Sequence, residues 1–374
     1  MPSEYVIVTQ CFYPDVGGIE GLMTGLADYT HSAGHAVTVL AERIRHKSAV
    51  PVSPKPYDVM RFGGPRPWRR WRKRLNLARI ARERGKHIRG LFLDSWKSVE
   101  ALPSHLDLPV TVLAHGMEYM PDANPGKKQR ISAALARCSA VIANSRYTAA
   151  LVLPYLDENA DKLDVVLPPI TPIGAPTPRA VEAMRGRIGG GGPVIATVTR
   201  LEPRKGIDAV IRALPDVLAR HPSCRFVVAG AGEDRERLEA LAAGLNVRDA
   251  VLFLGRVSDE DKAALLSIAD VFAMPVRREG RSVEGFGLSY AEAGWFGVPS
   301  LAGREGGAAE AVLDGETGLV CDGLNVAEVA GSLIALLDDE ALRKRMGEAA
   351  KLRVQSELIW PAVIGRYLNS FKSS

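Results

Sequence analysis

The region that decides the fold is Pro193 to Arg220, which reads PVIATVTRLEPRKGIDAVIRALPDVLAR. Its first six residues are apolar or small and predict a buried strand, and the polar stretch after them predicts a loop. Apolar residues then recur at helical spacing and predict a helix from about Asp208 to Arg220. The same order of strand and helix recurs downstream, at Arg225–Ala229 with Arg235–Ala243, at Val251–Leu254 with Asp259–Ser267, and at Val271–Met274.

The N-terminal half begins in the same way. Tyr5–Thr9 predicts a strand, Pro14–Gly18 predicts a loop, and a helix is expected from Ile19 to about Ser32, before a second strand at Ala36–Leu40. Strands alternating with amphipathic helices indicate parallel sheets covered on both faces. We therefore expect an α/β protein with two doubly wound, Rossmann-like domains.

The boundary between the two domains is expected in a segment rich in proline and glycine that ends in four consecutive glycines at 189–192. Such a composition predicts a flexible linker, placed here at 170–190. The predicted domains are 1–175 and 189–357, with a last helix over 358–374 that packs back on the first. Because ligands of these sheets bind outside the carboxyl ends of the strands, we expect the site in a cleft between the domains.

Bulk composition restricts the class of protein. The chain has 374 residues, 47% hydrophobic and 24% charged, with a net charge of +5, which suits a soluble globular protein with an anionic partner. Its four cysteines are far apart, so neither a disulfide scaffold nor a zinc site is indicated. No apolar run approaches the ~20 residues of a membrane span, and the N-terminus lacks a signal-peptide pattern, so we expect a cytoplasmic protein.

Four features carry candidate chemistry. Gly17 and Gly18 end the first loop at the start of a helix, where free amides and the helix dipole favour a diphosphate. His115 follows the strand Val110–Ala114, at the edge where ligands bind. Arg200 and Lys205 follow the first strand of the second half and can neutralise a diphosphate leaving group without a metal ion. Each of these features also has an ordinary structural explanation when taken alone.

The fourth feature is a pair of carboxylates, Glu284 and Glu292, eight residues apart. Gly285, Phe286 and Gly287 predict a loop whose backbone can bond a sugar or phosphate, and Leu288 is expected to begin a helix that contains Glu292. A plain amphipathic helix explains Glu292 but leaves the two glycines around Phe286 unexplained.

These segments resemble glycosyltransferase family 4, of the GT-B superfamily, in which Glu284 and Glu292 match the paired-glutamate motif. The resemblance is dense from about 193 to 320 and is carried by Thr199–Gly206, Val228–Gly232, Phe253–Arg256, Val283–Glu292, Gly297–Pro299, Glu305–Gly307 and Asp314–Gly318. The N-terminal half contributes only Gly17-Gly18, His115-Gly116 and Ala143–Ser145. Leu167–Thr171 departs from the asparagine–glycine–valine turn of many members.

The resemblance implies a fold, an activity and roles for the matching residues. The fold is GT-B, and the activity is transfer of a sugar from a nucleotide diphosphate with retention of anomeric configuration and without cofactor or metal. The approach to Glu284 is somewhat like that of bacterial mannosyltransferases, which favours GDP-mannose over a UDP-sugar. The implied catalytic residues are His115, Glu284, Arg200 and Lys205, and the implied donor-binding residues add Gly17, Gly18, Gly255, Arg256, Val257, Gly285, Phe286, Gly287, Leu288 and Glu292.

A strongly basic segment lies between Arg61 and Arg89, with a single acid, Glu83. Trp68, Trp71 and Leu75 recur within it at helical spacing, a pattern typical of an interfacial membrane helix. A solvated helix whose tryptophans pack on the sheet is the alternative, and nucleic acid would also be attracted to such charge. We expect an anionic membrane and no nucleic acid. The residues expected to face the membrane or acceptor are Trp68, Arg69, Arg70, Trp71, Arg72, Lys73 and Arg74.

The predicted function is thus a transferase acting on a lipid-linked or envelope-glycan acceptor at the inner face of the plasma membrane. A soluble small-molecule acceptor and a non-catalytic protein that binds nucleotide sugars are the alternatives. A Rossmann oxidoreductase is disfavoured because Arg235 stands where its fingerprint after Gly230 needs a third glycine. A metal-dependent transferase with an Asp-x-Asp motif is disfavoured because Ser258 and the apolar residues after Asp259–Asp261 predict the capped first turn of a helix.

Overall fold

A computed structural model describes residues 3–371 except 16, 44–52, 105 and 121. The chain divides into two compact units. Unit 1 comprises Met1–Thr171 and Trp360–Ser374, and unit 2 comprises Pro172–Ile359. No helix among the described residues is both long enough and apolar enough to cross a membrane.

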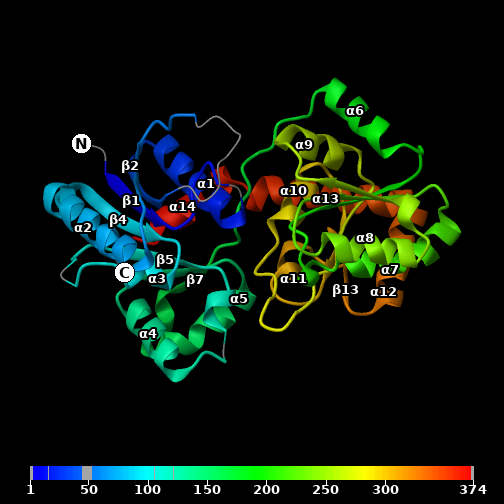
Figure 1. The fold of residues 1–374 in the computed structure, drawn as a ribbon. Helices are drawn as coiled ribbons and strands as arrows, with labels where there is room; N and C mark the ends of the chain where they lie inside the picture. The colour runs from blue at the N-terminus through cyan, green and yellow to red at the C-terminus, as the bar shows by residue number, and fades with distance from the viewer. Residues whose placement is uncertain (1–2, 16, 44–52, 105, 121, 372–374) are drawn as a thin grey trace. The chain divides into compact units, whose positions relative to one another are not determined.

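Unit 1 is built on a seven-stranded sheet with the order β3-β2-β1-β4-β5-β6-β7 (Figure 1). All neighbouring strands are parallel. The order reverses direction between β1 and β4, the arrangement of a doubly wound domain. The strands are β1 (Glu4–Thr9), β2 (Ala36–Glu42), β3 (Asp58–Phe62), β4 (Ile88–Leu93), β5 (Val110–Ala114), β6 (Ala140–Ala143) and β7 (Leu163–Val165).

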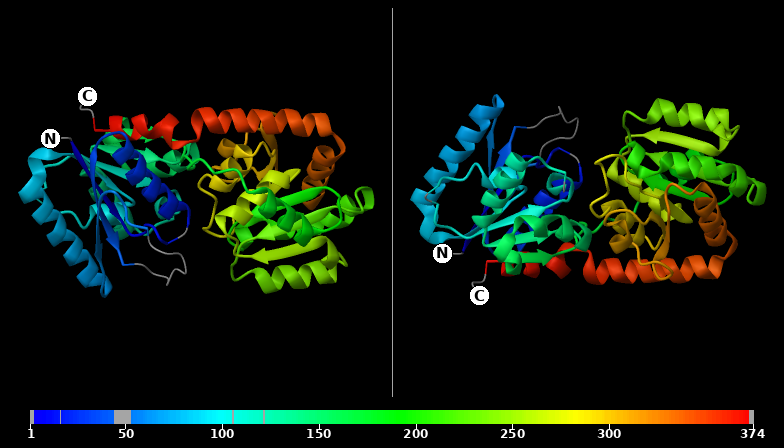
Figure 2. Two further views of the ribbon diagram at one scale, coloured as in Figure 1. Left: turned by 90° about the horizontal axis from the view of Figure 1, so that it is seen from above. Right: turned by 90° about the horizontal axis from the view of Figure 1, so that it is seen from below.

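Helices cover both faces of this sheet (Figure 2). Alternate residues of its strands point to opposite sides, so each face has apolar side chains that a layer of helices buries. Tyr5 and Ile7 of β1 belong to the core on one face, whereas Val6 and Val8 belong to the core on the other. The helices are α1 (Gly18–Ser32), α2 (Arg66–Arg84), α3 (Trp96–Val99), α4 (Pro125–Ala136), α5 (Arg146–Val152) and α14 (Trp360–Asn369).

Helix α14 packs beside α1 on the face that contains Tyr5 (Figure 1). Trp360 lies against Gly25 of α1 so closely that a Cβ at Gly25 would come within 2.0 Å of the indole nitrogen. Phe371 lies against Gly90 of β4 in the same way, at 2.3 Å. The two glycines therefore make room for aromatic side chains from the end of the chain.

Unit 2 contains a six-stranded parallel sheet with the order β10-β9-β8-β11-β12-β13. Its strands are β8 (Val194–Val198), β9 (Arg225–Ala229), β10 (Val251–Gly255), β11 (Val271–Met274), β12 (Ser300–Gly303) and β13 (Gly318–Cys321). Its helices are α6 (Pro178–Ile188), α7 (Ile207–Arg220), α8 (Arg235–Gly244), α9 (Asp259–Ile268), α10 (Leu288–Trp295), α11 (Ala308–Ala311), α12 (Val326–Asp338) and α13 (Glu340–Glu357).

The expectation of a flexible linker over 170–190 is wrong for most of that segment. Residues Pro178–Ile188 form the eleven-residue helix α6, capped by the Thr177 side chain. Met184 and Ile188 are buried against β8 and α9 in the core of unit 2. Proline here occupies the first turn of a helix, where its missing N–H costs nothing, and so it marks a helix start within the expected linker.

Candidate functional site

The polar centre of unit 2 is formed by the loop after β8 and the loop before α10. Lys205 Nζ lies 2.5 Å from Glu284 Oε2, and Arg204 Nη1 lies 2.7 Å from the same oxygen. All three side chains are largely buried. A tight turn over Pro203–Lys205 directs the Arg204 and Lys205 side chains inward. It ends at Gly206, whose φ is 71°. A Cβ at Gly206 would lie 2.0 Å from the Pro275 carbonyl, so only glycine fits this turn.

Burial and charge act in opposite directions on these groups. Burial raises the pKa of Glu284, but the adjacent Lys205 and Arg204 charges outweigh it and lower that pKa to about 2. Glu284 is therefore ionised at neutral pH. The three groups form a buried ion cluster, and Glu202, which pairs with Arg204 at 2.8 Å, supplies a second carboxylate beside it.

Arg200 is not in direct contact with Lys205 or Glu284. Its side chain is 74% exposed, and its guanidinium lies 3.0 Å from Glu202. Glu202 in turn pairs with Arg204 at 2.8 Å. The predicted diphosphate ligands Arg200 and Lys205 are thus joined only through a chain of alternating charges. Arg204, which sequence reasoning missed, is the central link of that chain.

The loop before α10 has the form expected from its glycines. Gly287 has a φ of 96° and immediately precedes Leu288, the first residue of α10. Phe286 is buried, and the Glu284 carbonyl accepts a hydrogen bond from the Gly307 amide at 2.9 Å. Gly285 is half-buried. Contacts of both the side chain and the backbone of Glu284 therefore fix this segment.

Glu292, the second carboxylate of the pair, lies inside α10 and is half-buried. It accepts a hydrogen bond from Lys262 of α9 at 2.7 Å. Lys262 was not foreseen from the sequence. Ser258 caps α9 by accepting from the Asp261 amide, so Asp259–Asp261 form the first turn of a helix, as the sequence predicted.

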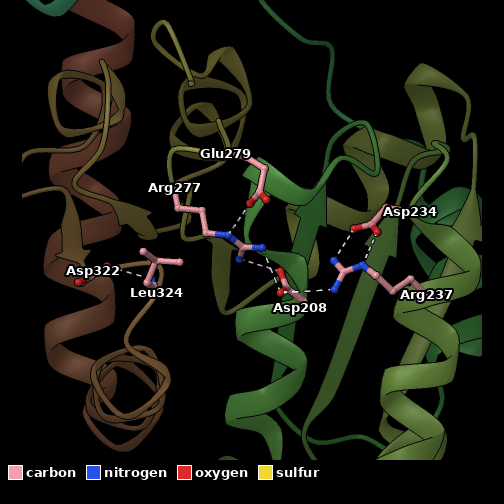
Figure 3. A network of polar contacts seen from close by, with 7 residues as sticks. All are labelled: Asp208, Asp234, Arg237, Arg277, Glu279, Asp322 and Leu324. Carbon is pink, nitrogen blue, oxygen red and sulfur yellow. Dashed lines mark hydrogen bonds and ion pairs between the residues drawn. The ribbon is translucent and has the colours of Figure 1, made fainter. Parts of the chain in front are cut away.

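A second ion network lies at the N-terminal end of α7, around Asp208 (Figure 3). Arg277 donates two hydrogen bonds to Asp208, at 2.8 and 3.1 Å, and a weaker one to Glu279. Arg237 donates to Asp234 and lies 3.7 Å from Asp208. The Arg277 amide also donates to the Arg204 carbonyl at 3.0 Å. Asp208 and Arg277 thus fix the chain between β11 and α10 against the turn that carries Arg204.

The residues expected to line the base pocket follow β10. Gly255 ends that strand with a φ of 72°, and its carbonyl accepts from the Gly230 amide at 2.7 Å. Arg256 is exposed, and Val257 is half-buried against the core. All three positions lie at the carboxyl end of β10. Their role in binding the base stays a prediction.

In unit 1, His115 follows β5 and is half-buried. Its Nε2 lies 3.1 Å from the Asp94 carbonyl, which can only accept, so Nε2 carries the proton. The His115 amide donates to Glu118 at 2.8 Å, and the next residue, Gly116, has a φ of 111°. The Nε2 contact thus orients the ring, and the amide contact fixes the backbone of His115. Gly17 and Gly18 are exposed where α1 begins.

Asp94 was missed by sequence reasoning although it follows β4 directly, which was a usable signal. The residue is 4% exposed. Its carboxylate accepts hydrogen bonds from the Gln10 amide at 2.5 Å, from Ser98 at 2.7 Å, and from Thr9 and Ser95, each at 3.1 Å. Asp94 therefore connects the loop after β1 with α3 and, through its carbonyl, with His115.

Helix α2 exposes the apolar stripe that its sequence predicted. The exposed fractions of Trp68, Trp71 and Leu75 are 61%, 59% and 48%. The alternative in which the tryptophans pack on the sheet is excluded, since Leu77 and Ile80 occupy that face. One assignment is wrong: Lys73 does not face outward. It is 5% exposed and lies 3.2 Å from Ser98 Oγ, because its position in the helix is on the inner face.

The basic residues around the stripe differ in their contacts. Arg69 pairs with Glu42, and Arg70 donates to the Glu100 carbonyl at 3.1 Å. Arg72 donates to the Gly63 carbonyl at 2.9 Å, and Arg74 is exposed. The outward cationic surface is therefore smaller than the sequence suggests.

Two parallel Rossmann-like sheets, each with polar loops at the carboxyl ends of its strands, define a protein of the GT-B class. The cyanobacterial sucrose-phosphate synthase of Thermosynechococcus elongatus has the same fold, with a TM-score of 0.79 over 98% of this chain and 97% of that chain, at 20% identity. A family model for group 1 glycosyl transferases matches residues 182–353, and one for Glycosyltransferase Family 4 matches residues 16–172. The chain thus carries a Glycosyltransferase Family 4 domain followed by a group 1 glycosyl transferase domain.

Among curated relatives, a GDP-mannose-dependent monoacylated alpha-(1-6)-phosphatidylinositol monomannoside mannosyltransferase of Corynebacterium glutamicum is 42% identical over 183 residues. That alignment covers 48% of this chain and 47% of the relative. A GDP-mannose-dependent alpha-(1-6)-phosphatidylinositol monomannoside mannosyltransferase of Mycolicibacterium smegmatis is 43% identical over 180 residues, or 47% of each chain. The chain thus aligns with about half the length of these relatives.

Proposed function

We propose that this protein is a retaining hexosyltransferase that moves a sugar from a nucleotide diphosphate sugar to a lipid-linked acceptor at an anionic membrane surface. The observation that carries the proposal is the buried cluster of Arg204, Lys205 and Glu284 behind β8. It concentrates positive charge next to a fixed carboxylate, which suits a ligand that joins a diphosphate to a hydroxyl-rich sugar. GDP-mannose is the favoured donor, because the two mannosyltransferases described above are named for it.

In the proposed reaction the acceptor oxygen bonds to the anomeric carbon while the bond from that carbon to the diphosphate oxygen breaks. The acceptor proton passes to the departing phosphate. Lys205 and Arg200 would stabilise the charge that develops on the diphosphate, a contribution of about 3–4 kcal/mol for one well-placed donor. Glu284 and the backbone of Gly285 and Phe286 would hold the sugar hydroxyls, and Glu292 the ribose. No metal ion is assigned to this step.

On the acceptor side, the exposed Trp68 and Trp71 beside outward arginines support binding to anionic lipid. The names of the two relatives, which include a phosphatidylinositol monomannoside, point to an acceptor of the same kind. We therefore place the protein at the inner surface of the plasma membrane. A soluble acceptor, and binding of the nucleotide sugar without transfer, are the competing functions.

The test is to incubate the purified protein with GDP-mannose or UDP-sugars and a membrane lipid extract, with and without EDTA. Transfer of mannose to lipid, with an α-linked product by NMR and no loss of rate in EDTA, is expected. A β-linked product would refute retention, and loss of rate in EDTA would refute metal independence. Nucleotide-sugar binding with neither transfer nor hydrolysis would leave the non-catalytic function.

His115 offers a test on unit 1. In the proposed reaction it contacts the sugar near the reacting carbon, so His115→Ala should lower the transfer rate by roughly 100-fold. Binding of free GDP, measured by calorimetry, should stay within a factor of two because no role in holding the nucleotide is assigned to His115. Equal rates in the variant and the unchanged protein would remove His115 from the mechanism.

A further inference from the structure

A cavity of about 410 Å³ lies in unit 1 beside the ends of β2 and β3, apart from the residues discussed so far as donor ligands. Arg43, Arg61, Arg72 and Asn76 line it with their side chains, together with Phe62 and the glycines at 63–64. Of the lining residues that the structure describes, none carries a carboxylate. Three arginines around one hollow make the cavity strongly cationic.

The contacts of these arginines orient them without neutralising them. Arg61 donates to the carbonyls of Glu42, at 3.0 Å, and of Tyr13. Arg72 donates to the Gly63 carbonyl at 2.9 Å. Carbonyl oxygens are neutral acceptors, so each bond fixes a guanidinium while its charge remains. Glu42, the acid at the end of β2, pairs its carboxylate with Arg69.

Burial affects one of the three arginines, because Arg61 is half-buried whereas Arg43 and Arg72 are exposed. It lowers the pKa of Arg61, an effect that the charge of Asp15 only partly opposes. Arg43 lies with its Cδ about 3.2 Å from the position that a Cβ on Gly63 would occupy, so the cavity wall is formed closely around it. A half-buried guanidinium bonded to neutral carbonyls, with two exposed guanidinium groups beside it, suits the binding of an anion.

The position of the cavity connects it with the reaction. Arg43 and Gly63 follow β2 and β3 directly, so the cavity opens at the carboxyl ends of the strands, the same edge of the sheet that carries His115 after β5. Ligands of doubly wound sheets bind at that edge. Arg72 also follows Trp71 on α2, and the Trp68 Cβ lies 3.7 Å from the Cβ position of Gly64. The cavity therefore adjoins the exposed tryptophans.

We infer that this cavity binds a phosphate group of the acceptor, with Arg43, Arg61 and Arg72 as its ligands and Asn76 bonding a neighbouring hydroxyl. Guanidinium forks match tetrahedral phosphate oxygens, and a volume of about 410 Å³ accommodates the phosphate with an attached polyol. Only the assignment of this phosphate to the acceptor rests on the proposed function. The phosphate site itself does not depend on it. The phosphate can belong to a phospholipid headgroup or to a soluble sugar phosphate.

The site is tested first without any reaction. Inorganic phosphate and glycerol 3-phosphate are titrated into the protein at constant ionic strength and followed by calorimetry. The cavity variant Arg43→Gln/Arg72→Gln should bind both at least about 10-fold more weakly. The control Arg79→Gln/Arg82→Gln, on the exposed side of α2 and of the same net charge, should change binding less than 2-fold. Melting temperatures of both variants show that they are folded.

Equal weakening in the two variants, or no phosphate binding by the unchanged protein, would overturn the inference. The source is then separated by transfer assays with phosphatidylinositol vesicles and with soluble inositol phosphate. A raised KM in the cavity variant for one of them, with an unchanged KM for the nucleotide sugar, identifies the acceptor that uses the site. Unchanged KM values for both acceptors would reject its role in the reaction. If no transfer occurs at all, the proposed function fails while the titration still decides the phosphate site.

Discussion

The cations of the two units are held in different ways. In unit 2, Lys205 and Arg204 are buried against Glu284, and Arg277 is buried against Asp208. In unit 1, Arg61 and Arg72 are fixed by neutral carbonyl oxygens beside a cavity, and the charge of Asp15 acts on Arg61. The first arrangement fixes a rigid geometry with the protein's own carboxylates, and the second leaves positive charge for an external anion. Under the proposed function the first arrangement serves the donor and the second the acceptor, so mutations can test the two separately.

The largest expected effect comes from breaking the unit 2 cluster at its lysine. Lys205→Ala should reduce the transfer rate on the order of a thousandfold, about 4 kcal/mol, because the diphosphate loses its nearest buried cation. Glu284 keeps Arg204 as a partner, so the fold should persist. Steady-state kinetics with the nucleotide sugar measure the effect, with Lys344→Ala on the exposed side of α13 as control. Similar rates in both variants would contradict the assignment.

Removing the shared carboxylate tests the same cluster through stability. The folded-state pKa of Glu284, about 2, lies below the ordinary 4.5, so ionised Glu284 stabilises the fold above about pH 4.5 and this contribution is lost as the pH falls toward 2. Glu284→Gln should therefore lower the free energy of unfolding by about 3 kcal/mol at pH 7.

Urea unfolding of the variant and the unchanged protein at pH 7, 4 and 3 measures this difference. It should shrink steadily below pH 4.5. A difference that stays constant down to pH 3 would show that packing, and not charge, is responsible.

The third prediction addresses the exposed face of unit 1. Trp68→Ala/Trp71→Ala should weaken binding to anionic vesicles by roughly 30-fold, or about 2 kcal/mol, since two aromatic side chains no longer enter the interface. Stability should not change, because both side chains are mostly exposed. Vesicle sedimentation measures the affinity. Leu324→Ala/Leu352→Ala in unit 2, with exposed fractions of 69% and 67%, is the matched control and should have no effect.

The smallest effect distinguishes two neighbouring cations of α2. Arg74→Gln should weaken binding to anionic vesicles about 5-fold, as expected for one surface charge worth about 1 kcal/mol. Lys73→Gln removes the same charge from the inner face and should change vesicle binding less than 2-fold. The same sedimentation assay compares them. A larger loss for Lys73→Gln would mean that α2 binds by a different face.

Much of the fold was predictable, because its strands and helices carry strong local patterns. The strand after Pro193, the helix that begins at Leu288 and the capped turn at Ser258 lie where their sequence places them. The two-domain GT-B fold is confirmed. Helix α6 was hidden because the prolines and glycines around it indicate a linker equally well.

The contacts within the site were less predictable than its residue types. Lys205 and Glu284 are 79 residues apart, and no local pattern shows that they share an oxygen contact. The role of Arg204 could not be predicted for the same reason. Arg204 and Lys205 are adjacent basic residues, and the conformation of the turn decides where their side chains point. Lys73 illustrates the opposite error: helical spacing identified the exposed tryptophans, but the same spacing places Lys73 on the buried side.

The aromatic closure of unit 1 by Trp360 and Phe371 has a consequence for biosynthesis. The sheet that contains Tyr5 and Phe92 is translated first, yet the side chains that complete its core are translated last, after the whole of unit 2. During that interval the part of this face that α14 and Phe371 will cover stays open to water, a condition that favours chaperone binding or aggregation. Unit 2 has no such dependence, so it can complete its core while the N-terminal unit still waits for its final helix.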